Sequence, residues 1–156
     1  MLIRKFSSKD LDAVEKIEKE AFTNPYPTSL LIGFWSMYPD CFYVAEIDGK
    51  VVGYILGSME WGNGHIISLA VKKEYRGLGI GKILLKTLEN YYFNTAKCNY
   101  IVLEVRVSNT VARKFYYKMG YKDRKLLPNY YEDGEDAILM IKKRQNAKGV
   151  LIISLW

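Results

Sequence analysis

The chain has 156 residues, which fits one domain of roughly 100–200 residues. Hydrophobic residues make up 49% of the chain and charged residues 26%. This composition is close to the globular average and excludes a disordered, collagen-like or coiled-coil protein. The net charge of +6 attracts anionic ligands as well as keeping a protein in solution. Because the basic residues are spread along the chain, nucleic-acid binding is only a minor hypothesis.

Few residues are available for a disulfide framework or a metal site. The chain has two cysteines, Cys41 and Cys98, and one histidine, too few for either, so we expect no metal. The first residues lack the apolar stretch of a signal peptide. The longest apolar run, residues 150–156, is far shorter than the roughly 20 residues of a spanning helix. We therefore expect a soluble, cytoplasmic protein without a membrane anchor.

Local signals mark the ends of several secondary-structure elements. Ser7 and Asp10 form a capping pair before an amphipathic helix. Pro25 and Pro27 end that helix, and the pair Asp48-Gly49 predicts a hairpin. The predicted elements, in chain order, are strand 3–6, helices 11–21 and 29–38, strands 42–47 and 51–59, a loop at 61–64, strand 65–71, helix 80–91, strand 100–107, a helix capped by Asn109 and ending near Gly120, and strands 122–127 and 137–141.

The order of these elements predicts the fold class. Strand 65–71, helix 80–91 and strand 100–107 form a βαβ unit, whose two strands run parallel with a right-handed crossover. The earlier strands are predicted to pair as antiparallel hairpins. We therefore expect an α/β fold of the mixed α+β type, with a central mixed sheet of about seven strands and four helices.

A glycine-rich loop joins strand 65–71 to the following helix. Its sequence is Arg76-Gly77-Leu78-Gly79-Ile80-Gly81-Lys82. Alternate glycines let a backbone turn tightly and approach a ligand closely. The start of the helix adds unpaired N–H groups and the positive end of its dipole, which together bind phosphate. A glycine-rich tight turn without a ligand is the alternative explanation.

Two common phosphate loops do not fit this segment. A Walker loop needs glycine where Arg76 stands and Ser or Thr where Ile83 stands. The dinucleotide motif needs glycine at the position of Lys82 or of Leu84. ATPase and Rossmann dehydrogenase functions are therefore excluded.

The loop instead resembles the coenzyme A pyrophosphate loop of the GNAT acetyltransferases, R/Q-x-x-G-x-G/A. Within this superfamily the chain is similar to the protein N-terminal (N-alpha) acetyltransferases of the archaeal and eukaryotic catalytic-subunit type, with the bacterial RimI type next. The likeness covers residues 3–142. Besides Arg76, Gly79 and Gly81, the segments that carry it are Ser68-Leu69-Ala70-Val71, residues 103–109, Tyr116, Gly120-Tyr121 and residues 130–137.

The resemblance implies one GNAT domain over residues 1–145, followed by an apolar extension at 146–156. It implies that acetyl-CoA donates its acetyl group to the free α-amine of a protein, ribosomal proteins among them, by direct attack of the amine on the thioester. Two alternatives remain open. One is a GNAT enzyme for a lysine, polyamine or other small amine; the other is a non-catalytic module that senses acetyl-CoA or holds ribosomal RNA.

The resemblance also implies which residues bind acetyl-CoA. In the family two parallel strands separate, and the thioester arm lies between them. Backbone groups of Leu69, Ala70 and Val71 would hold the pantetheine and polarise the carbonyl, and Asn109 would contact the pantetheine. Tyr116 would lie beside the sulfur. The pyrophosphate would rest on the loop formed by Arg76, Gly77, Leu78, Gly79, Ile80, Gly81 and Lys82.

Three residues are candidates for acid–base chemistry. A terminal ammonium has a pKa of roughly 7.7–8.0, so a weak base suffices to deprotonate it. Glu104 is the candidate base because a carboxylate among apolar strand residues is costly to bury; an ion pair with Arg106 is its alternative role. His65 would share an ordered water with Glu104, or be structural. Tyr116 would protonate the thiolate.

The peptide side of the site and the tail complete these expectations. Tyr26, Tyr130 and Tyr131 would bind the substrate backbone, unless they are ordinary core aromatics. Several relatives carry glutamate where Asn24 stands, which leaves the preferred first residue of the substrate open. We expect the apolar tail to add a strand to its own sheet or to a neighbour's, giving a homo-oligomer in the second case.

Overall fold

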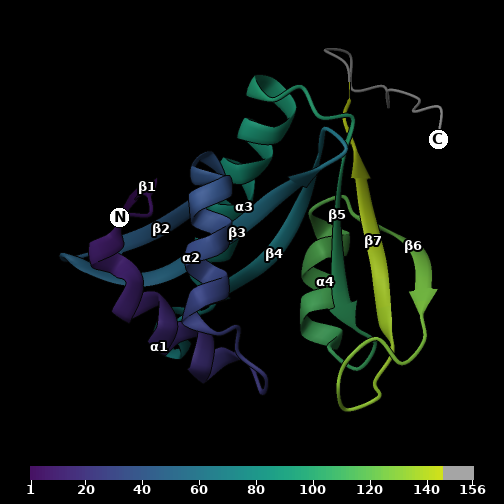
Figure 1. The fold of residues 1–156 in the computed structure, drawn as a ribbon, viewed down its shortest axis with the longest axis horizontal. Coiled ribbons are helices and arrows are strands. Elements are labelled where there is room, and N and C mark those ends of the chain that lie inside the picture. The colour runs from purple at the N-terminus through teal and green to yellow at the C-terminus, as the bar shows by residue number, and fades with distance from the viewer. Residues whose placement is uncertain (146–156) are drawn as a thin grey trace.

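The computed structural model describes residues 1–145, which form a seven-stranded sheet and four α-helices, the numbers predicted (Figure 1). Short 3₁₀ turns and a π-helical turn over Tyr91–Thr95 complete the secondary structure. The helices and strands are β1 (Leu2–Lys5), α1 (Leu11–Ala21), α2 (Thr28–Met37), β2 (Phe42–Ile47), β3 (Lys50–Glu60), β4 (Asn63–Val71), α3 (Ile80–Asn90), β5 (Tyr100–Arg106), α4 (Thr110–Lys118), β6 (Lys122–Leu127) and β7 (Ala137–Lys143).

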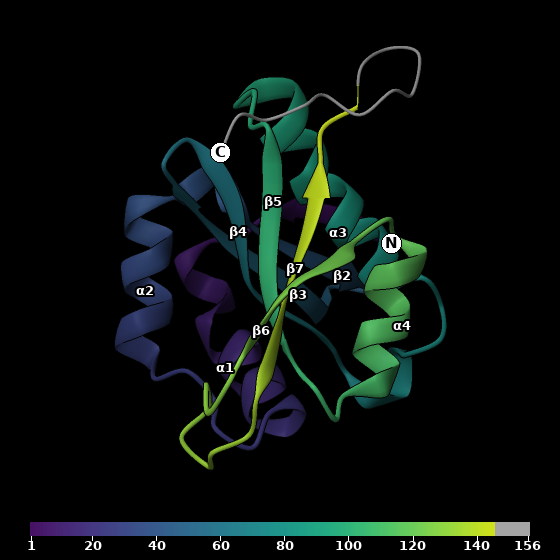
Figure 2. The same cartoon turned by 90° about the vertical axis from the view of Figure 1, so that its right-hand side faces the viewer.

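The strand order in the sheet is β1-β2-β3-β4-β5-β7-β6. β4 and β5 pair in parallel, as the βαβ pattern predicts, and the other neighbouring strands pair antiparallel. Helices α1 and α2 cover one face of the sheet, and α3 and α4 cover the other (Figure 2). Each face has its own apolar core. Val14, Ile17, Leu31, Phe42 and Tyr54 belong to the first core, and Ile55, Leu84, Leu88, Ile101 and Met140 to the second.

Two tight hairpin turns hold the first half of the sheet in register. Asp48 and Gly49 both have positive φ angles, 51° and 77°, as a two-residue type I′ turn requires. Trp61 and Gly62 form a second such turn, with φ angles of 54° and 75°. The predicted loop 61–64 is therefore too long, because β4 begins at Asn63. The shorter turn fixes the residues that face each other at the ends of β3 and β4.

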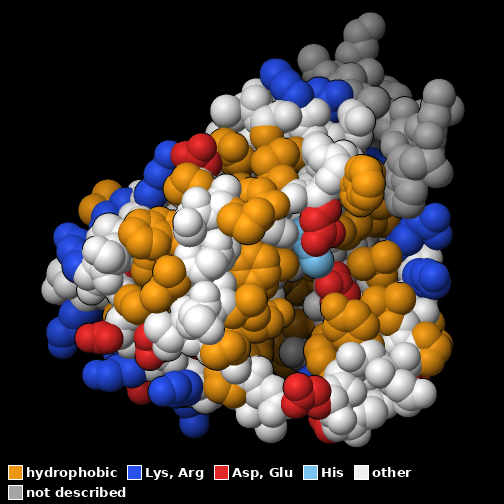
Figure 3. All heavy atoms as spheres, in the orientation of Figure 1, with side chains coloured by type: hydrophobic (Ala, Val, Ile, Leu, Met, Phe, Trp, Pro, Cys, Tyr) orange, Lys and Arg blue, Asp and Glu red, His pale blue; other side chains and the backbone are white. Residues whose placement is uncertain are grey.

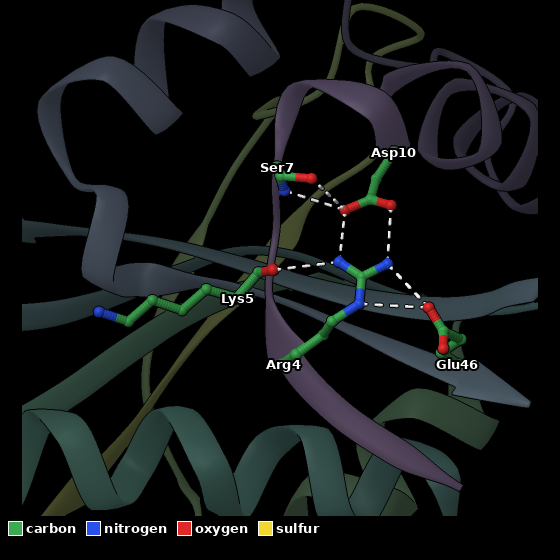
Figure 4. Close-up of polar contacts among 5 residues, drawn as sticks. All are labelled: Arg4, Lys5, Ser7, Asp10 and Glu46. Atoms are coloured by element: carbon green, nitrogen blue, oxygen red, sulfur yellow. Dashed lines mark hydrogen bonds and ion pairs between the residues drawn. The ribbon is translucent and has the colours of Figure 1, made fainter. Parts of the chain in front are cut away.

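Arg4 connects the N-terminal strand β1 to the segment before α1 and to β2 through hydrogen bonds (Figure 4). Its guanidinium donates to both carboxylate oxygens of Asp10, at 2.7 and 2.9 Å, and to Glu46 Oε1 on β2 at 3.0 and 3.2 Å. Asp10 also accepts a 2.9 Å hydrogen bond from the Ser7 backbone N–H, so the predicted pair of Ser7 and Asp10 is in contact. Burial disfavours the ionised carboxyl, but the hydrogen bonds from Arg4 and Ser7 leave the pKa of Asp10 lowered.

Other expectations concern the cysteines, the membrane and the tail. Cys41 and Cys98 are both buried and not disulfide-bonded. Over residues 1–145, no helix combines the length and apolar character needed to cross a bilayer. The extension at 146–156, which we expected to add a strand, lies outside the described residues.

Candidate active site

The parallel strands β4 and β5 separate soon after they begin. Their register holds only two residue pairs, Gly64 with Ile101 and His65 with Val102. Beyond His65 no strand within residues 1–145 pairs with this edge of β4, although β4 continues to Val71 and β5 to Arg106. The surface is hollowed between the two strands (Figure 3). His65, where the two strands stop pairing, lies between the carboxylates of Glu60 and Glu104. The separation that the resemblance implied is therefore present.

A β-bulge lies on β4 inside this opening. Leu56 of β3 pairs with Ser68 and Gly57 pairs with Ile66, which leaves Ile67 without a partner. An extra residue shifts the alternation of side chains by one position. As a result Ile67 and Ser68 both face the α1 and α2 side of the sheet, while Leu69 packs on the opposite core. The sequence carries no signal for this bulge.

His65 and Glu104 are in direct contact where the strands begin to separate. The His65 Nε2 atom lies 2.8 Å from Glu104 Oε1 and 2.9 Å from Oε2. The resemblance implied an ordered water between these groups, whereas the structure places them within hydrogen-bonding distance. Their side chains are only 15% and 14% exposed. Burial lowers the pKa of His65, but the contacts with Glu104 and Glu60 outweigh it, and the net pKa is raised.

Arg106, the alternative partner of Glu104, is engaged elsewhere. Its Nη1 atom donates to Asp133 at 2.8 Å and to Glu135 at 2.9 Å. Its guanidinium also lies 4.0 Å from the centre of the Tyr131 ring, a cation–π distance. The carboxylate of Glu104 is thus left to His65 and to the Tyr130 hydroxyl, which donates to Oε1 at 3.0 Å.

Of the three tyrosines predicted to bind substrate, Tyr130 contacts Glu104 and Tyr131 packs on Tyr130. The rings of Tyr130 and Tyr131 meet edge to face with centroids 5.0 Å apart. Tyr26 lies close enough that the charges of Glu18 and Glu104 add to burial in raising its pKa. Burial, the main cause, raises the pKa of Tyr131 to about 12 despite the opposing charge of Arg106. These phenols remain neutral hydrogen-bond donors at physiological pH.

A buried glutamate positions the Tyr26 loop. Glu18 on α1 is 1% exposed and accepts a 2.8 Å hydrogen bond from the Tyr26 backbone N–H. It also accepts hydrogen bonds from Ser68 Oγ on β4, at 2.8 Å, and from the Tyr54 hydroxyl on β3. One carboxylate therefore links the loop between α1 and α2 to the strands beside the opening.

The glycine loop lies at the other end of β4. Gly77 and Gly79 have φ angles of 79° and 83°, a conformation that costs other residues about 1–2 kcal/mol. An added Cβ at either glycine would meet no atom within 4 Å, so the loop is open on that side. Gly79 is the N-cap of α3 and provides no side-chain cap, which leaves the first N–H groups of the helix without a side-chain acceptor. Arg76 Nε donates to the Val71 carbonyl at 2.9 Å and fixes the loop to the end of β4.

Asn109 is the N-cap of α4, and Tyr116 lies within this helix. The Asn109 side chain accepts from the Ala112 N–H at 3.1 Å and caps the helix, as predicted. Tyr116 is 8% exposed and packs edge to face on Phe115 and Tyr121. No described residue hydrogen-bonds its hydroxyl, and burial raises the pKa of that hydroxyl well above its ordinary value. The roles of Asn109 and Tyr116 toward acetyl-CoA remain predictions.

Sequence reasoning missed three residues of this region: Glu18, Glu60 and Tyr92. Glu18 could have been found, because it follows Val14 by one helical turn and so falls on the buried face of α1. Glu60 approaches His65 only across the hairpin. Tyr92 donates hydrogen bonds to the carbonyls of Ser58, at 2.7 Å, and His65, at 3.2 Å. It fits there because Gly64 has no Cβ, which would lie 2.6 Å from the Tyr92 ring.

Comparisons with known proteins agree with this geometry. The sequence profile of the acetyltransferase (GNAT) family matches residues 11–121. The chain is 84% identical to an uncharacterized N-acetyltransferase of Methanocaldococcus jannaschii over 156 residues, which is 100% of both chains. It is 40% identical to an N-alpha-acetyltransferase of Sulfurisphaera tokodaii, over 88% of this chain and 90% of the relative. The crystal structure of Ard1 from Thermoplasma volcanium superposes with a TM-score of 0.89 at 32% identity, covering 93% of this chain and 98% of that one.

Proposed function

The chain belongs to the acetyltransferase (GNAT) family, and from this membership and the geometry of its site we propose that it is an N-alpha-acetyltransferase. It transfers the acetyl group of acetyl-CoA to the free α-amine at the N-terminus of a protein. The similarity to N-alpha-acetyltransferases over most of the chain supports this activity.

The observation that carries the proposal is the separation of β4 and β5 with Glu104 at its inner end. An unpaired strand edge can hydrogen-bond an extended ligand, and the pantetheine arm carries amides suited to the edge of Leu69, Ala70 and Val71. The uncapped N–H groups at the start of α3 suit a pyrophosphate. One straight cofactor lying along β4 would satisfy both regions and bring its thioester toward Glu104.

In the proposed reaction Glu104 accepts a proton from the substrate ammonium. The N–H bond breaks, an O–H bond forms on the carboxylate, and the neutral amine is free to attack the thioester carbon. Backbone N–H groups near Leu69 and Ala70 stabilise the oxyanion. Tyr116 protonates the departing thiolate as the C–S bond breaks, and the extra proton on the attacking nitrogen is released to restore the Tyr116 hydroxyl. Burial raises the pKa of Tyr116, which keeps the phenol protonated before the transfer although it makes the phenol a weaker acid. His65 supports Glu104 through the contact at 2.8 Å.

Tyr26, Tyr130 and Tyr131 would bind the first residues of the peptide. Their rings offer flat apolar surface and their hydroxyls hydrogen-bond donors. Tyr130 donates to Glu104, which supports a peptide-binding surface next to the proposed base. A surface of three tyrosines suits a polypeptide N-terminus better than a small free amine, which needs no backbone contacts.

We also propose that residues 1–145 are the catalytic domain.

The function is tested with two matched peptides. One has a free N-terminus and the other a blocked N-terminus with an internal lysine, and mass spectrometry locates any acetyl group formed from acetyl-CoA. We expect transfer only to the free α-amine. Transfer to the lysine, or only to polyamines, would instead assign the chain to the small-amine enzymes.

The Glu104→Gln variant tests catalysis against mere binding. We expect kcat to fall by about 10²–10⁴-fold, the usual contribution of a general base, while coenzyme A affinity measured by calorimetry stays unchanged. A non-catalytic module would show no turnover even with the wild-type chain. Unchanged turnover in the variant would remove Glu104 from the mechanism.

A further inference from the structure

The second ring nitrogen of His65 faces a carboxylate that the proposed reaction does not use. Ser58 of β3 is paired with His65 of β4, and Glu60 lies two residues further on the same face of β3. The tight turn at Trp61-Gly62 keeps this register. Glu60 Oε1 consequently lies 3.2 Å from His65 Nδ1. The contact lacks hydrogen-bond alignment, and buried Nδ1 has no other partner among the described residues.

Both ring nitrogens of His65 thus lie next to carboxylate oxygens, Nδ1 beside Glu60 and Nε2 beside Glu104. A neutral imidazole carries one N–H and satisfies only one of these acceptors, whereas the imidazolium carries two. The uncharged groups nearby add no hydrogen-bond acceptor for the ring nitrogens of His65. Tyr130, between β6 and β7, donates to Glu104, and Tyr92 donates to the backbone carbonyl of His65.

We propose that Glu60 is a positioning residue for acetyl transfer, which holds His65 in its doubly protonated form and through it keeps the Glu104 carboxylate facing the substrate amine. The proposal rests on the proposed function. In it the ammonium N–H bond still breaks toward Glu104, and the proton passes to bulk water when the product leaves. Glu60 itself is 58% exposed and acts only through His65.

A direct test measures the protonation of His65. It is the only histidine of the chain, so its ring signals in an NMR titration need no assignment by mutagenesis. We expect Glu60→Gln to move the titration midpoint of His65 to lower pH by about one unit, as loss of a neighbouring opposite charge does. The matched control is Glu15→Gln, which removes a carboxylate on α1 that has no partner among residues 1–145. An unchanged midpoint in Glu60→Gln would overturn the proposal.

The kinetic test uses the pH dependence of kcat/KM for a free-amine peptide. Below both His65 midpoints the ring is protonated in wild type and variant, so their rates should be equal. Above both midpoints the small protonated fraction differs by the ratio of the two acidity constants, so we expect Glu60→Gln to fall behind wild type as pH rises through the midpoints, by up to roughly tenfold, the factor that one pKa unit supplies. A merely structural role would slow the variant equally at every pH and would refute the proposal.

The two measurements separate this proposal from the proposed function. If the wild-type chain acetylates no peptide, the function fails and the kinetic role of Glu60 fails with it, while the titration still decides whether Glu60 charges His65. If the peptides are acetylated but the midpoint does not move, only the role of Glu60 fails. Circular dichroism of Glu60→Gln checks that the variant is folded.

Discussion

Two residues of β5 on the same face, Glu104 and Arg106, have different partners, and this difference decides the chemistry of the site. Arg106 is neutralised by Asp133 and Glu135 from the segment before β7. Glu104 consequently has no guanidinium next to it and contacts a phenol and an imidazole instead. A bidentate arginine partner would hold a carboxylate in a strong ion pair. The contacts of Glu104 come instead from Tyr130 and from His65, the residue through which Glu60 is proposed to act.

Tyr116 offers a test of the proton donor. Replacing it with phenylalanine removes a hydroxyl that no described residue hydrogen-bonds, so the free energy of unfolding should change little. If the hydroxyl protonates the thiolate, Tyr116→Phe should lower kcat by about 10²-fold or more with little change in the KM for acetyl-CoA. Steady-state kinetics checks this.

The control for Tyr116 is the neighbouring Tyr117→Phe. The Tyr117 hydroxyl donates to Asp123 on the exposed side of α4, so its loss should leave kcat unchanged. Equal effects of the two variants would indicate that α4 responds to any lost hydroxyl. Full activity of Tyr116→Phe would show that water or another residue protonates the departing thiolate.

Residue types on strands could be predicted as site candidates, but their contacts could not. Glu104 was detectable because it is charged in an apolar strand, and His65 because it begins the facing strand. Their direct contact depends on the parallel register of β4 and β5, and the approach of Glu60 depends on a hairpin turn of two residues rather than four. Distances of this kind arise from pairing between segments, which local sequence does not encode.

At the scale of elements, a substitution in the turn from β4 into α3 tests whether this turn binds coenzyme A. Gly79→Ala places a Cβ on a residue with φ of 83° and open space around it. The stability cost should be about 1–2 kcal/mol, but the Cβ or a relaxed backbone would displace the N–H groups proposed to hold the pyrophosphate. We expect coenzyme A affinity, measured by calorimetry, to fall at least tenfold.

Gly49→Ala is the matched control for the loop. Gly49 has φ of 77° and equally open space, but lies in the hairpin between β2 and β3. It should therefore lose similar stability, seen as a lower melting temperature, with unchanged coenzyme A affinity. Equal loss of affinity in both variants would mean that strain anywhere in the sheet weakens binding, and would argue against a phosphate site at residues 76–82.

The loop between α1 and α2 depends on Glu18. Glu18→Gln keeps the shape of the side chain but replaces one carboxylate oxygen by an NH₂ group, which donates and cannot accept a hydrogen bond. A hydrogen bond from Tyr26, Ser68 or Tyr54 is then lost, at about 1–3 kcal/mol for a buried polar group left unpaired. We expect the KM for peptide to rise while the KM for acetyl-CoA stays constant, since the loop carries Tyr26 and not the glycine turn.

The half-buried Glu15 on the same helix supplies the comparison for Glu18. Glu15→Gln removes a charge without removing a hydrogen bond to any described residue, so both KM values and the melting temperature should stay at wild-type levels. A rise of both KM values in Glu18→Gln would contradict the proposed link to the peptide side and indicate general loosening of the sheet.

Elements could be predicted more completely than their details. Proline, glycine and the spacing of apolar residues located the helices and strands, because these signals act within a few residues. The bulge at Ile67 was not predicted, since an extra residue in β4 is visible only against its partner β3. It is also the feature that turns Ser68 toward Glu18, so the link from α1 to the opening could not be seen either.

At the scale of the whole molecule, the edges of the sheet are protected in two ways. β6 forms one edge and is exposed and charged, with Lys122, Asp123, Arg124 and Lys125 in its sequence, which discourages pairing with another chain. β1 forms the other edge. It is four residues long and is held through Arg4 to Asp10 and Glu46. The parallel pair β4 and β5 lies between these edges and opens internally.

The ion pair at the β1 edge predicts how stability depends on pH. The pKa of Asp10 is lowered in the folded chain, relative to about 3.9 in an unfolded one. A lowered pKa stabilises the fold above the unfolded value, and this contribution disappears as pH falls through the folded value. Wild-type stability should therefore drop below about pH 4, and Asp10→Asn should remove that part of the drop.

At pH 7 we expect Asp10→Asn to be less stable than wild type by about 1.5–3 kcal/mol, the range for hydrogen bonds to charged groups, and the gap should close in acid. Urea unfolding at pH 7, 5 and 3 measures the difference in stability at neutral pH and its disappearance in acid. Asp12→Asn, an exposed acid two residues further on, should follow the wild-type curve. A gap between wild type and Asp10→Asn that stays constant with pH would show that the contact contributes through packing, because only a titrating partner makes the difference depend on protons.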